Sequence, residues 1–303
     1  MGWRTILVTK PCKLSLQNRQ LLYEPEDSEA VTVPIEDISV VILETKYALL
    51  TSALLTRLAE SGAVVFSCGD NHIPTGAFFP FHKHSRYSEI ADRQAAWSEP
   101  FKKRVWQEIV KQKISNQAAF LKTAQIPSWE NLEHMAARVQ SGDAENHEAQ
   151  AAKLYWESLF SDFTREKEDW RNSCLNYGYA IMRGAVARSL VGAGLLPCFG
   201  LNHSSGLNAF NLADDIIEPF RAFVDRKVFL MFKITTLRDT PDLLPSDKQE
   251  LAKLLGELCF IAGEKTSLLS AADTSCFSLV SATKSKDPKD IKLPRFISEN
   301  GPS

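Results

Sequence analysis

The sequence predicts an α+β protein in which a small, mostly β N-terminal domain precedes a larger all-α domain. Short apolar or β-branched runs separated by turn residues fill the first eighty positions, and from Ser88 onward apolar residues recur at helical intervals. The length of 303 residues is enough for two cores. We therefore expect a β-rich domain over 1–85, a helical domain over 86–283 and a mobile basic tail over 284–303.

Composition excludes several classes of protein. Hydrophobic residues make up 44% and charged residues 24%, which is ordinary for a globular protein. The six cysteines are scattered and form no C-x-x-C pair, so we expect reduced thiols and a cytoplasmic location rather than a disulfide or zinc scaffold. The start, MGWRTILVTKP, has no apolar signal core, and Arg183 and Arg188 interrupt the most apolar helical stretch, so we expect no membrane segment.

The β-rich part is predicted from its runs in order. Strands are expected at WRTILVT, CKLSL, RQLLYE and AVTVP, followed by IEDISVVILE, AVVFSC and TGAFFPF. The run IEDISVVILE is too apolar to be half exposed and is predicted to be a central strand. Between the later runs, Thr51 or Ser52 can cap a helix that Gly62 ends.

The helical part is predicted from apolar periodicity. Trp97, Phe101, Val105 and Ile109 lie four residues apart on one helix face. A second helix follows Asn146, its predicted cap, and a third, rich in Gly, Ala and Ser, covers 173–196 as the central helix. Further helices are expected near 246–262 and 264–281. The tail carries five bases against two acids between 284 and 295, which indicates mobility.

One loop and the helix after it bring together side chains that can bind a metal. His203 lies in a loop rich in Ser, Gly and Asn, and the following segment carries Asp214, Asp215 and Glu218 at helical spacing. Like charges at this spacing repel unless a cation joins them. Mixed His and carboxylate ligands suit Mn²⁺ or Mg²⁺, with Zn²⁺ as an alternative. An ordinary surface His beside an acidic helix would give the same pattern.

A third ligand decides between these interpretations. In the segment HEAQAAKLYWESLF, Glu148 falls on the same helix face as Ala152, Tyr155 and Leu159. A carboxylate directed toward a core needs a cation or several donors to offset its desolvation. The alternative is a solvated Glu that the dipole at the helix start favours.

Basic and acidic residues are segregated along the chain although the net charge is only −2. Residues 81–125 carry nine bases and four acids (9 − 4 = +5), whereas 128–170 carry four bases and ten acids (4 − 10 = −6). We take six bases as candidate phosphate contacts: Lys102, Lys103, Arg104, Lys111, Arg183 and Arg188. For Arg183 and Arg188, internal ion pairing is an equal alternative.

The order of three motifs resembles a known family. The segments IEDISVVI and ESGAVVFSCGDNHIPTG are followed by HEAQAAKLYW, by LNYGYAIMRGAVARSLVGAGLLPCFGLNH and by FNLADDIIEPFRAFVD. This arrangement, over nearly the whole chain, is similar to the CRISPR-associated integrase/endonuclease of spacer acquisition, the universal first CRISPR-associated protein. The compact length suggests its type II-like branch.

The resemblance assigns roles to individual residues. The first metal-binding glutamate of the family falls on Glu148, its histidine on His203 and its final acid on Glu218, with Asp215 one turn earlier as the less secure metal ligand. Ala149 stands where the family frequently has Gly. His203 could instead serve as a general acid or base.

The resemblance also implies an activity and partners. Such proteins are antiviral integrases that insert a short DNA duplex into a CRISPR array, using Mg²⁺ or Mn²⁺, by attack of a DNA 3′-hydroxyl on a leader-repeat phosphodiester; water in its place gives a nuclease. They form homodimers through the N-terminal domain and assemble with a small ferredoxin-like companion into a heterohexamer, with the type II effector nuclease as a further candidate partner. The rival interpretations are a stand-alone metal-dependent nuclease of branched or repair DNA and a non-catalytic DNA-binding scaffold.

Overall fold

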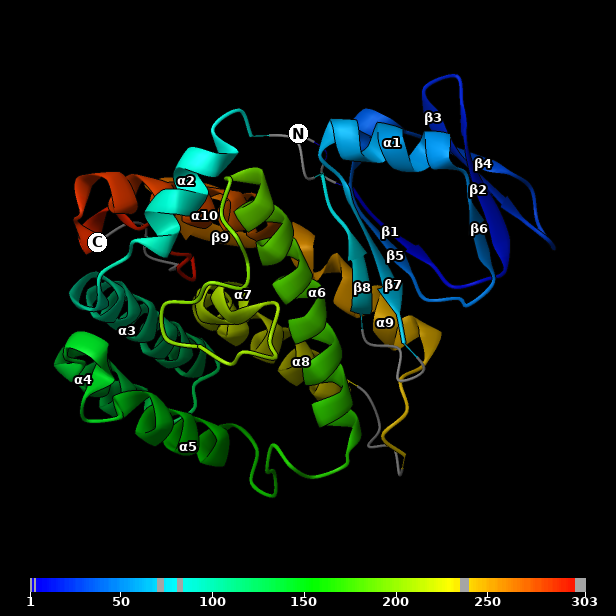
Figure 1. The fold of residues 1–303 in the computed structure, drawn as a ribbon. Coiled ribbons are helices and arrows are strands. Elements are labelled where there is room, and N and C mark those ends of the chain that lie inside the picture. Colours follow the sequence, from blue (N-terminus) through cyan, green and yellow to red (C-terminus); the bar gives the residue numbers. More distant parts are fainter. Residues whose placement is uncertain (1, 3, 70–73, 81–83, 235–239, 298–303) are drawn as a thin grey trace.

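The computed structural model describes the chain at residues 2, 4–69, 74–80, 84–234 and 240–297 (Figure 1). Its first part contains strands β1 to β8 and one helix, and the second part is mainly helical, which confirms the α+β prediction. The strands of the first part are β1 (Arg4–Val8), β2 (Cys12–Gln17), β3 (Gln20–Pro25), β4 (Val31–Pro34), β5 (Ile38–Leu43), β6 (Ala48–Leu50), β7 (Val64–Cys68) and β8 (Pro74–Phe78).

These strands form two four-stranded sheets. One sheet has the order β4-β3-β2-β6, with antiparallel pairs except for the parallel pair of β2 with β6. The other has the order β1-β5-β7-β8, with β1, β5 and β7 parallel and β8 antiparallel at the edge. Strand β5 therefore lies inside its sheet, as its apolar run predicts.

Alternate residues of β5 serve two different cores. Val40 and Ile42 pack into the large core of the helical part, whereas Val41 and the partly buried Leu43 pack into the smaller core between the sheets. Successive strand residues point to opposite faces, so one strand serves both cores. The helical part thus rests directly on the second sheet, and a domain boundary at residue 85 stays a prediction.

The helices begin and end close to the sequence expectations. Thr51 accepts a hydrogen bond from the amide of Leu54 at the start of α1 (Ser52–Ser61), and Gly62 ends that helix with a φ of 86°. The helical part contains α2 (Tyr87–Ala95), α3 (Glu99–Thr123), α4 (Trp129–Arg138), α5 (His147–Leu159), α6 (Trp170–Gly192), α7 (Asn211–Ile216), α8 (Arg221–Ile234), α9 (Pro245–Ala252) and α10 (Leu268–Ser285). Short 3₁₀ turns are η1 (Ile35–Asp37), η2 (Ser141–Asp143), η3 (Glu218–Phe220), η4 (Lys253–Gly256) and η5 (Pro288–Asp290).

No helix in the part of the chain that the structure describes combines the length and hydropathy that a membrane span needs.

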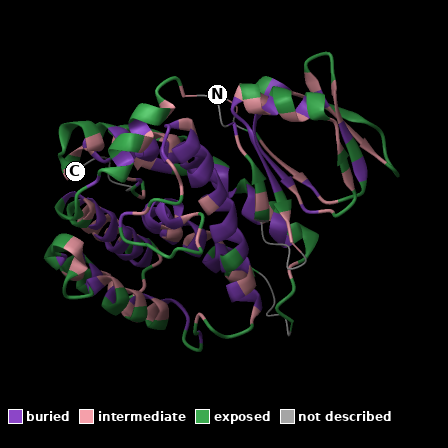
Figure 2. Cartoon of the chain, in the orientation of Figure 1, coloured by how far each residue is buried: buried purple, intermediate pink, exposed green. Residues whose placement is uncertain are grey.

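Helix α6 is the central helix of the second part and is buried along almost its whole length (Figure 2). It lies between the second sheet and helices α7, α8 and α10, whereas α9 contacts both α6 and β1 (Figure 1). Its glycines permit this close packing. A Cβ placed on Gly184 would lie 2.3 Å from the ring of Phe66 in β7, and one on Gly178 would lie 2.6 Å from Val224 in α8. The small-residue composition therefore has a steric cause.

We expect Gly184→Ala to lower the free energy of unfolding by about 1–3 kcal/mol, because the added methyl overlaps a buried ring. Gly192→Ala is the matched control in the same helix, since no atom lies within 4 Å of its added Cβ. Urea unfolding of both variants measures the difference. Equal stability of the two variants would show that Phe66 does not constrain this position.

Two sequence predictions near the C-terminus are wrong. The segment expected to continue as helix to 262 instead forms a hairpin of β9 (Leu258–Ile261) and β10 (Glu264–Ser267), with Ala262 and Gly263 at positive φ in its turn. The tail is not free over its described part. Arg295 pairs with Phe260 through two backbone hydrogen bonds, and Phe296 stacks on Phe223 with ring centroids 4.1 Å apart. Packing of the apolar side chains holds this part of the tail against the helical core although its composition is basic. Residues 298–303 lie outside the described ranges.

Candidate active site

Glu148 is positioned by the start of α5. Asp143, not the predicted Asn146, supplies the side-chain cap: its two carboxylate oxygens accept hydrogen bonds from the amides of His147 and Glu148, each at 2.9 Å. Asn146 occupies the cap position with a φ of 55°, and its side chain makes no capping bond. Glu148 lies in this first turn of α5, and its side chain is 26% exposed.

Glu218 lies where the chain changes from α7 to α8. Pro219 has no amide hydrogen, and the helix is interrupted by the 3₁₀ turn η3 at this point. Asn116 of α3 donates its side-chain amide to the carbonyl oxygens of Pro219 and Pro294, at 2.6 and 2.9 Å. This double hydrogen bond fixes the backbone next to Glu218, whose side chain is 5% exposed.

Lys113 of α3 joins the two glutamates. Its Nζ lies 2.6 Å from Oε1 of Glu148 and 2.6 Å from Oε2 of Glu218, and its side chain is 11% exposed. A carboxylate from helix α5 and one from the turn η3 thus converge on a single positive charge. A buried ammonium between them offsets the repulsion of the two carboxylates and the desolvation of all three groups.

A second cation completes the surroundings of Glu218. The Nε of Arg221 lies 2.7 Å from Oε1 of Glu218, while Lys113 contacts the other oxygen. Burial alone would raise the pKa of Glu218, but the charges of Lys113 and Arg221 outweigh it and lower the pKa to about 2. Glu218 is therefore ionised at neutral pH.

The loop that carries His203 is organised by Asp215, which is fully buried. Oδ2 of Asp215 accepts the amides of Leu201 and Asn202 at 2.5 and 3.2 Å. Oδ1 accepts the amide of His203 at 3.1 Å and lies 2.7 Å from its Nδ1. Gly200 is required beside this carboxylate, because a Cβ there would lie 2.1 Å from the carbonyl oxygen of His203.

These contacts place Asp215 against the backbone and the imidazole of the His203 loop. Both of its oxygens accept hydrogen bonds within the loop, and direct ligation of a metal by Asp215 stays a prediction. The ring of His203 packs edge-on against Trp106, with centroids 6.0 Å apart, and its side chain is 43% exposed. The hydrogen bond to Asp215 raises the pKa of His203 against the opposing effect of burial. Its Nε2 makes no hydrogen bond to any described residue.

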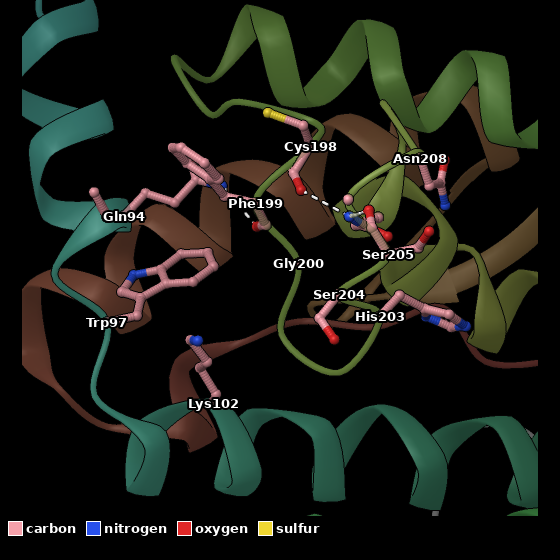
Figure 3. A pocket seen from close by; sticks show the side chains of 13 residues that line it. Gln94, Trp97, Lys102, Cys198, Phe199, Gly200, His203, Ser204, Ser205 and Asn208 are labelled. Atoms are coloured by element: carbon pink, nitrogen blue, oxygen red, sulfur yellow. Dashed lines mark hydrogen bonds between the residues drawn. The ribbon is translucent and has the colours of Figure 1, made fainter.

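A pocket of about 450 Å³ opens beside His203 (Figure 3). The loop from Cys198 to Asn208 forms one wall, and Gln94, Trp97 and Lys102 form the other. Lys102 points from α3 into the space between that helix and the loop (Figure 3). Gln94 is 2% exposed and ties the loop in place by donating to the carbonyl oxygens of Leu196 and Phe199, at 2.9 and 3.0 Å. The pocket thus gives access to the exposed imidazole.

The donor types fit a divalent cation that accepts oxygen and imidazole ligands. Glu148 and Glu218 already converge on one cation, and the fixed Nδ1 contact of His203 leaves Nε2 as the ring atom that could bind a metal. In the arrangement described, however, no three His, Cys, Asp or Glu side chains of the described residues are gathered closely enough to hold one ion. Lys113 supplies the positive charge between the carboxylates instead.

Comparison with known proteins identifies the family. The family model of the CRISPR associated protein Cas1 matches residues 6–241. The chain belongs to the Cas1 family. The CRISPR-associated endonuclease Cas1 of Neisseria meningitidis serogroup C is 42% identical over 299 residues, which cover 98% of this chain and 97% of that protein. A Cas1 protein of Saccharolobus solfataricus is 23% identical over 73% of each chain.

Solved structures share the fold. A Cas1 protein from Thermotoga maritima has a TM-score of 0.73 at 18% identity, covering 98% of this chain and all of that one. A casposase bound to integration product has a TM-score of 0.76 at 17% identity, covering 94% and 91% of the two chains. A chain of a Cas6-RT-Cas1–Cas2 complex has a TM-score of 0.72 at 19% identity, covering 98% of this chain and 36% of that one. The Cas1 fold therefore extends over the strand-rich and helical parts together.

The candidate DNA contacts of this Cas1-family chain are dispersed. Lys102 lines the pocket beside His203 and pairs with Glu99 at 2.8 Å, and Arg183 lies 3.8 Å from Asp214. Lys103 and Arg104 are exposed on α3, whereas Lys111 pairs with Glu108 at 3.6 Å. Lys83 of the basic block lies outside the described residues, as do residues 70–73 of one family segment.

Arg188 differs from the predicted DNA contact. It is 7% exposed, donates to the carbonyl oxygen of Gly62 at 3.0 Å and pairs with Asp273 at 3.0 Å. The structure thus gives it the internal ion pair that the sequence left as an alternative. Its position on the buried central helix is the physical reason, because most of that helix faces other elements.

Sequence reasoning missed three residues that organise the site: Lys113, Asp143 and Gln94. A signal for Lys113 was present, because it continues the four-residue apolar series that runs through Val105 and Ile109. A charge on an apolar helix face needs a partner of opposite charge to offset its desolvation, and this holds for Lys113 as it does for Glu148. Asp143 accepts from the first amides of α5, and Gln94 donates to the loop after α6. Both contacts depend on the path of a connecting segment, which residue spacing does not predict.

A buried carboxylate beside the site makes stability depend on pH. Asp225 of α8 accepts hydrogen bonds from Tyr155 and Tyr179, and burial raises its pKa from 3.8 to about 6 although both tyrosines oppose this. The folded state therefore binds a proton that the unfolded state has lost between these values. This contribution to stability is complete below about pH 3.8 and is lost as the pH rises through about 6.

We expect Asp225→Asn to gain stability relative to the wild type as the pH rises from 4 to 7, by on the order of 2 kcal/mol. The amide of asparagine stays neutral at every pH in this range, so the variant does not lose the stability that the wild type loses when Asp225 ionises. Urea unfolding of both proteins at a series of pH values measures the difference. Parallel stability curves for the two proteins would contradict a raised pKa at Asp225.

Proposed function

We propose that this Cas1-family chain is a metal-dependent DNA integrase and endonuclease that inserts short duplexes into a CRISPR array. The observation that carries the proposal is the convergence on one cation of Glu148, from α5, and Glu218, from the turn η3 between α7 and α8. The fixed imidazole of His203 stands on the adjacent loop, at a pocket that carries Lys102. Family membership supports action on DNA, and the casposase fold supports joining as well as cutting.

Glu148, His203 and Glu218 would hold the Mg²⁺ or Mn²⁺ ion. When bound, such an ion supplies Lewis-acid stabilisation of the reacting phosphate and its leaving oxygen. The reaction would be transesterification, in which a DNA 3′-oxygen forms a bond to phosphorus while the bond to the departing 3′-oxygen breaks. The proton of the attacking hydroxyl ends on the departing oxygen, so the number of phosphodiesters is unchanged. With water as the attacking group, the result is hydrolysis.

Other polar residues orient the proposed ligands Glu148, His203 and Glu218. Asp215 accepts from the loop amides and holds Nδ1 of His203, which directs Nε2 away from the loop. Arg221 occupies one oxygen of Glu218, and its guanidinium lies over the ring of Tyr179, 4.6 Å from the centroid. Lys102 offers a positive charge to phosphates that enter the pocket. Lys113 keeps the two carboxylates together until another cation takes its place.

The family also supports a proposal about assembly. We expect the chain to form a homodimer and to join a small ferredoxin-like companion in a heterohexamer on double-stranded DNA. The solved Cas6-RT-Cas1–Cas2 complex, which contains a chain of this fold, supports such a companion. Contact with a type II effector nuclease is part of the same proposal.

The test uses a short duplex with free 3′-hydroxyls, a supercoiled plasmid carrying a leader and repeat, the companion protein, and Mn²⁺ or Mg²⁺. Wild type is compared with Glu148→Ala, His203→Ala and Glu218→Ala, and joined strands are counted separately from nicked ones. We expect metal-dependent joining that all three variants lose. Joining that survives Glu218→Ala would exclude the proposed site.

Two other outcomes would replace the proposal. Metal-dependent nicking without joining, and without any need for the companion, would indicate a stand-alone nuclease of branched or repair DNA. DNA binding that needs no metal, survives Glu148→Ala and gives neither product would indicate a scaffold in which the glutamates are structural.

A further inference from the structure

The last described residues of the chain, 291–297, lie against the helical part, and we call them the C-terminal strap. The backbone of Arg295 pairs with Phe260 of β9 in both directions, at 2.8 and 2.9 Å. The ring of Phe296 stacks on Phe223 of α8, with centroids 4.1 Å apart and the ring planes 20° from parallel. The strap is therefore docked through both its backbone and its side chains.

A chain of hydrogen bonds runs from the strap to the turn η3. Nε of Arg295 donates to Oε1 of Gln112 at 3.2 Å, and Nε2 of Gln112 donates to Oδ1 of Asn116 at 3.0 Å. Nδ2 of Asn116 donates in turn to the carbonyl oxygens of Pro294 in the strap and Pro219 in η3, at 2.9 and 2.6 Å. Gln112 and Asn116 are one turn apart on α3, so this helix connects the strap to η3.

Asn116 uses all of its polar groups in this connection. It lies in the interior of α3 and is 2% exposed, although asparagine is a poor residue for a helix interior. Its Oδ1 accepts one hydrogen bond and its Nδ2 donates two. Loss of the donor would leave two buried carbonyl oxygens without a partner, which costs free energy at each of them. The buried amide thus holds the strap and η3 in one arrangement.

This arrangement fixes the backbone from which Glu218 extends, because Glu218 directly precedes Pro219 in η3. Lys113 and Arg221 contact the carboxylate itself. Lys113 lies three residues before Asn116, so one face of α3 contacts both the side chain and the backbone at this turn. A metal ion between the carboxylates would take the place of the ammonium of Lys113. The contact of Asn116 does not compete with the ion and would remain.

We infer that Asn116 and the C-terminal strap position Glu218 for metal binding, so that docking of the strap and occupation of the metal site favour each other. The inference rests on the proposed function, since it concerns the same metal site. Asn116 is a positioning residue in this role, because it acts through the backbone of η3. Coupling of this kind is reciprocal: a docked strap raises the affinity for the ion, and the bound ion stabilises the docked strap by the same factor.

The first test is a Mn²⁺ titration of the full chain, with the free ion measured by electron paramagnetic resonance. Asn116→Ala removes the double donor, and Phe296→Ala weakens docking of the strap without altering α3. We expect each variant to bind Mn²⁺ on the order of tenfold or more weakly, as is typical when a metal ligand loses its outer partner. Thermal melts identify a variant that is not folded, and Phe296→Ala tests the inference if Asn116→Ala is not.

Two control variants separate positioning from general stability. Ile297→Ala changes a strap side chain that is 40% exposed. Gly184→Ala places a methyl against Phe66 of the second sheet and so destabilises the fold at a different position. We expect wild-type Mn²⁺ affinity from both controls.

The second test is hydrogen exchange of the strap, which needs neither DNA nor activity. The amides of Arg295 and Phe260 pair the strap with β9, and their exchange reports opening of this pairing. We expect saturating Mn²⁺ to slow their exchange roughly fivefold or more in the wild type and to leave it unchanged in Glu218→Gln. Amides of β3, in the other sheet, are the internal control for general stabilisation.

The outcomes separate the inference from the proposed function. Wild-type Mn²⁺ affinity in Asn116→Ala and Phe296→Ala would overturn the inference, and so would an equal loss in Gly184→Ala, because lower stability would then explain it. The proposed function would stand in both cases, provided that Glu148→Ala still loses Mn²⁺ binding and joining. A wild-type chain without a Mn²⁺ site that depends on Glu148 would overturn the proposed function and the inference together.

Discussion

Lys113→Met is expected to destabilise the metal-free protein by about 3–5 kcal/mol, because it leaves two carboxylates facing each other without their shared cation. Methionine fills a similar volume, so the loss reports the charge rather than a cavity. Urea unfolding in EDTA measures it. Arg221 still neutralises Glu218 in the variant, and the unpaired charge is then mainly that of Glu148.

Mn²⁺ should reduce the difference in unfolding free energy between Lys113→Met and the wild type. If the ion takes the place of the ammonium between the carboxylates, the midpoint of unfolding rises more with Mn²⁺ in Lys113→Met than in the wild type. Lys111→Met is the matched control, because Lys111 lies on the same helix and pairs at a partly exposed position, where a pair contributes about 0–1 kcal/mol. Equal losses of stability in EDTA for Lys113→Met and Lys111→Met, or equal rises of their midpoints with Mn²⁺, would show that Lys113 does not occupy the position of a metal ion.

Asp215→Asn should have the second large effect, on both metal affinity and stability. The amide nitrogen of asparagine would face a donor where a carboxylate oxygen now accepts, and a buried donor without an acceptor costs about 1–3 kcal/mol. The ring of His203 would also lose the carboxylate that fixes its Nδ1. Loss of such an outer partner lowers metal affinity by about 10–100-fold. Calorimetric titration with Mn²⁺ and urea unfolding measure the two effects.

The neighbouring acid provides the control for this variant. Asp214 accepts from Asn208 at 2.7 Å, and its side chain is 18% exposed. Asp214→Asn therefore changes the same net charge one residue away without touching the His203 loop amides. We expect wild-type Mn²⁺ affinity from it. Similar affinity losses for Asp214→Asn and Asp215→Asn would mean that general electrostatics, rather than the orientation of His203, controls binding.

Much of the fold could be predicted because local pattern and tertiary environment agree. The apolar run of β5 matches a strand buried on both faces, and the cap of α1 at Thr51 and its end at Gly62 follow from local chemistry. The hairpin of β9 and β10 was missed because its turn uses Ala262, a residue that rarely adopts positive φ. The described tail was misjudged because composition did not reveal where Phe296 would stack.

Part of the candidate site could also be predicted. The inward direction of Glu148 was predicted from helix periodicity, and its ionic partner was found in the structure at Lys113. The pairing of His203 with Asp215 depends on a loop that turns back over α7, and residue spacing does not encode that path. The separation of Arg188 from the surface likewise depends on which face of α6 packs against α10.

The most direct test of the site is a titration of the full chain with Mn²⁺, followed by electron paramagnetic resonance of the free ion. We expect one strong site per chain that Glu148→Gln, Glu218→Gln and His203→Ala each weaken, while Glu108→Gln on the neighbouring face of α3 leaves it unchanged. Retention of wild-type Mn²⁺ affinity in Glu148→Gln and Glu218→Gln would contradict it, because the two carboxylates would then not share a metal ion.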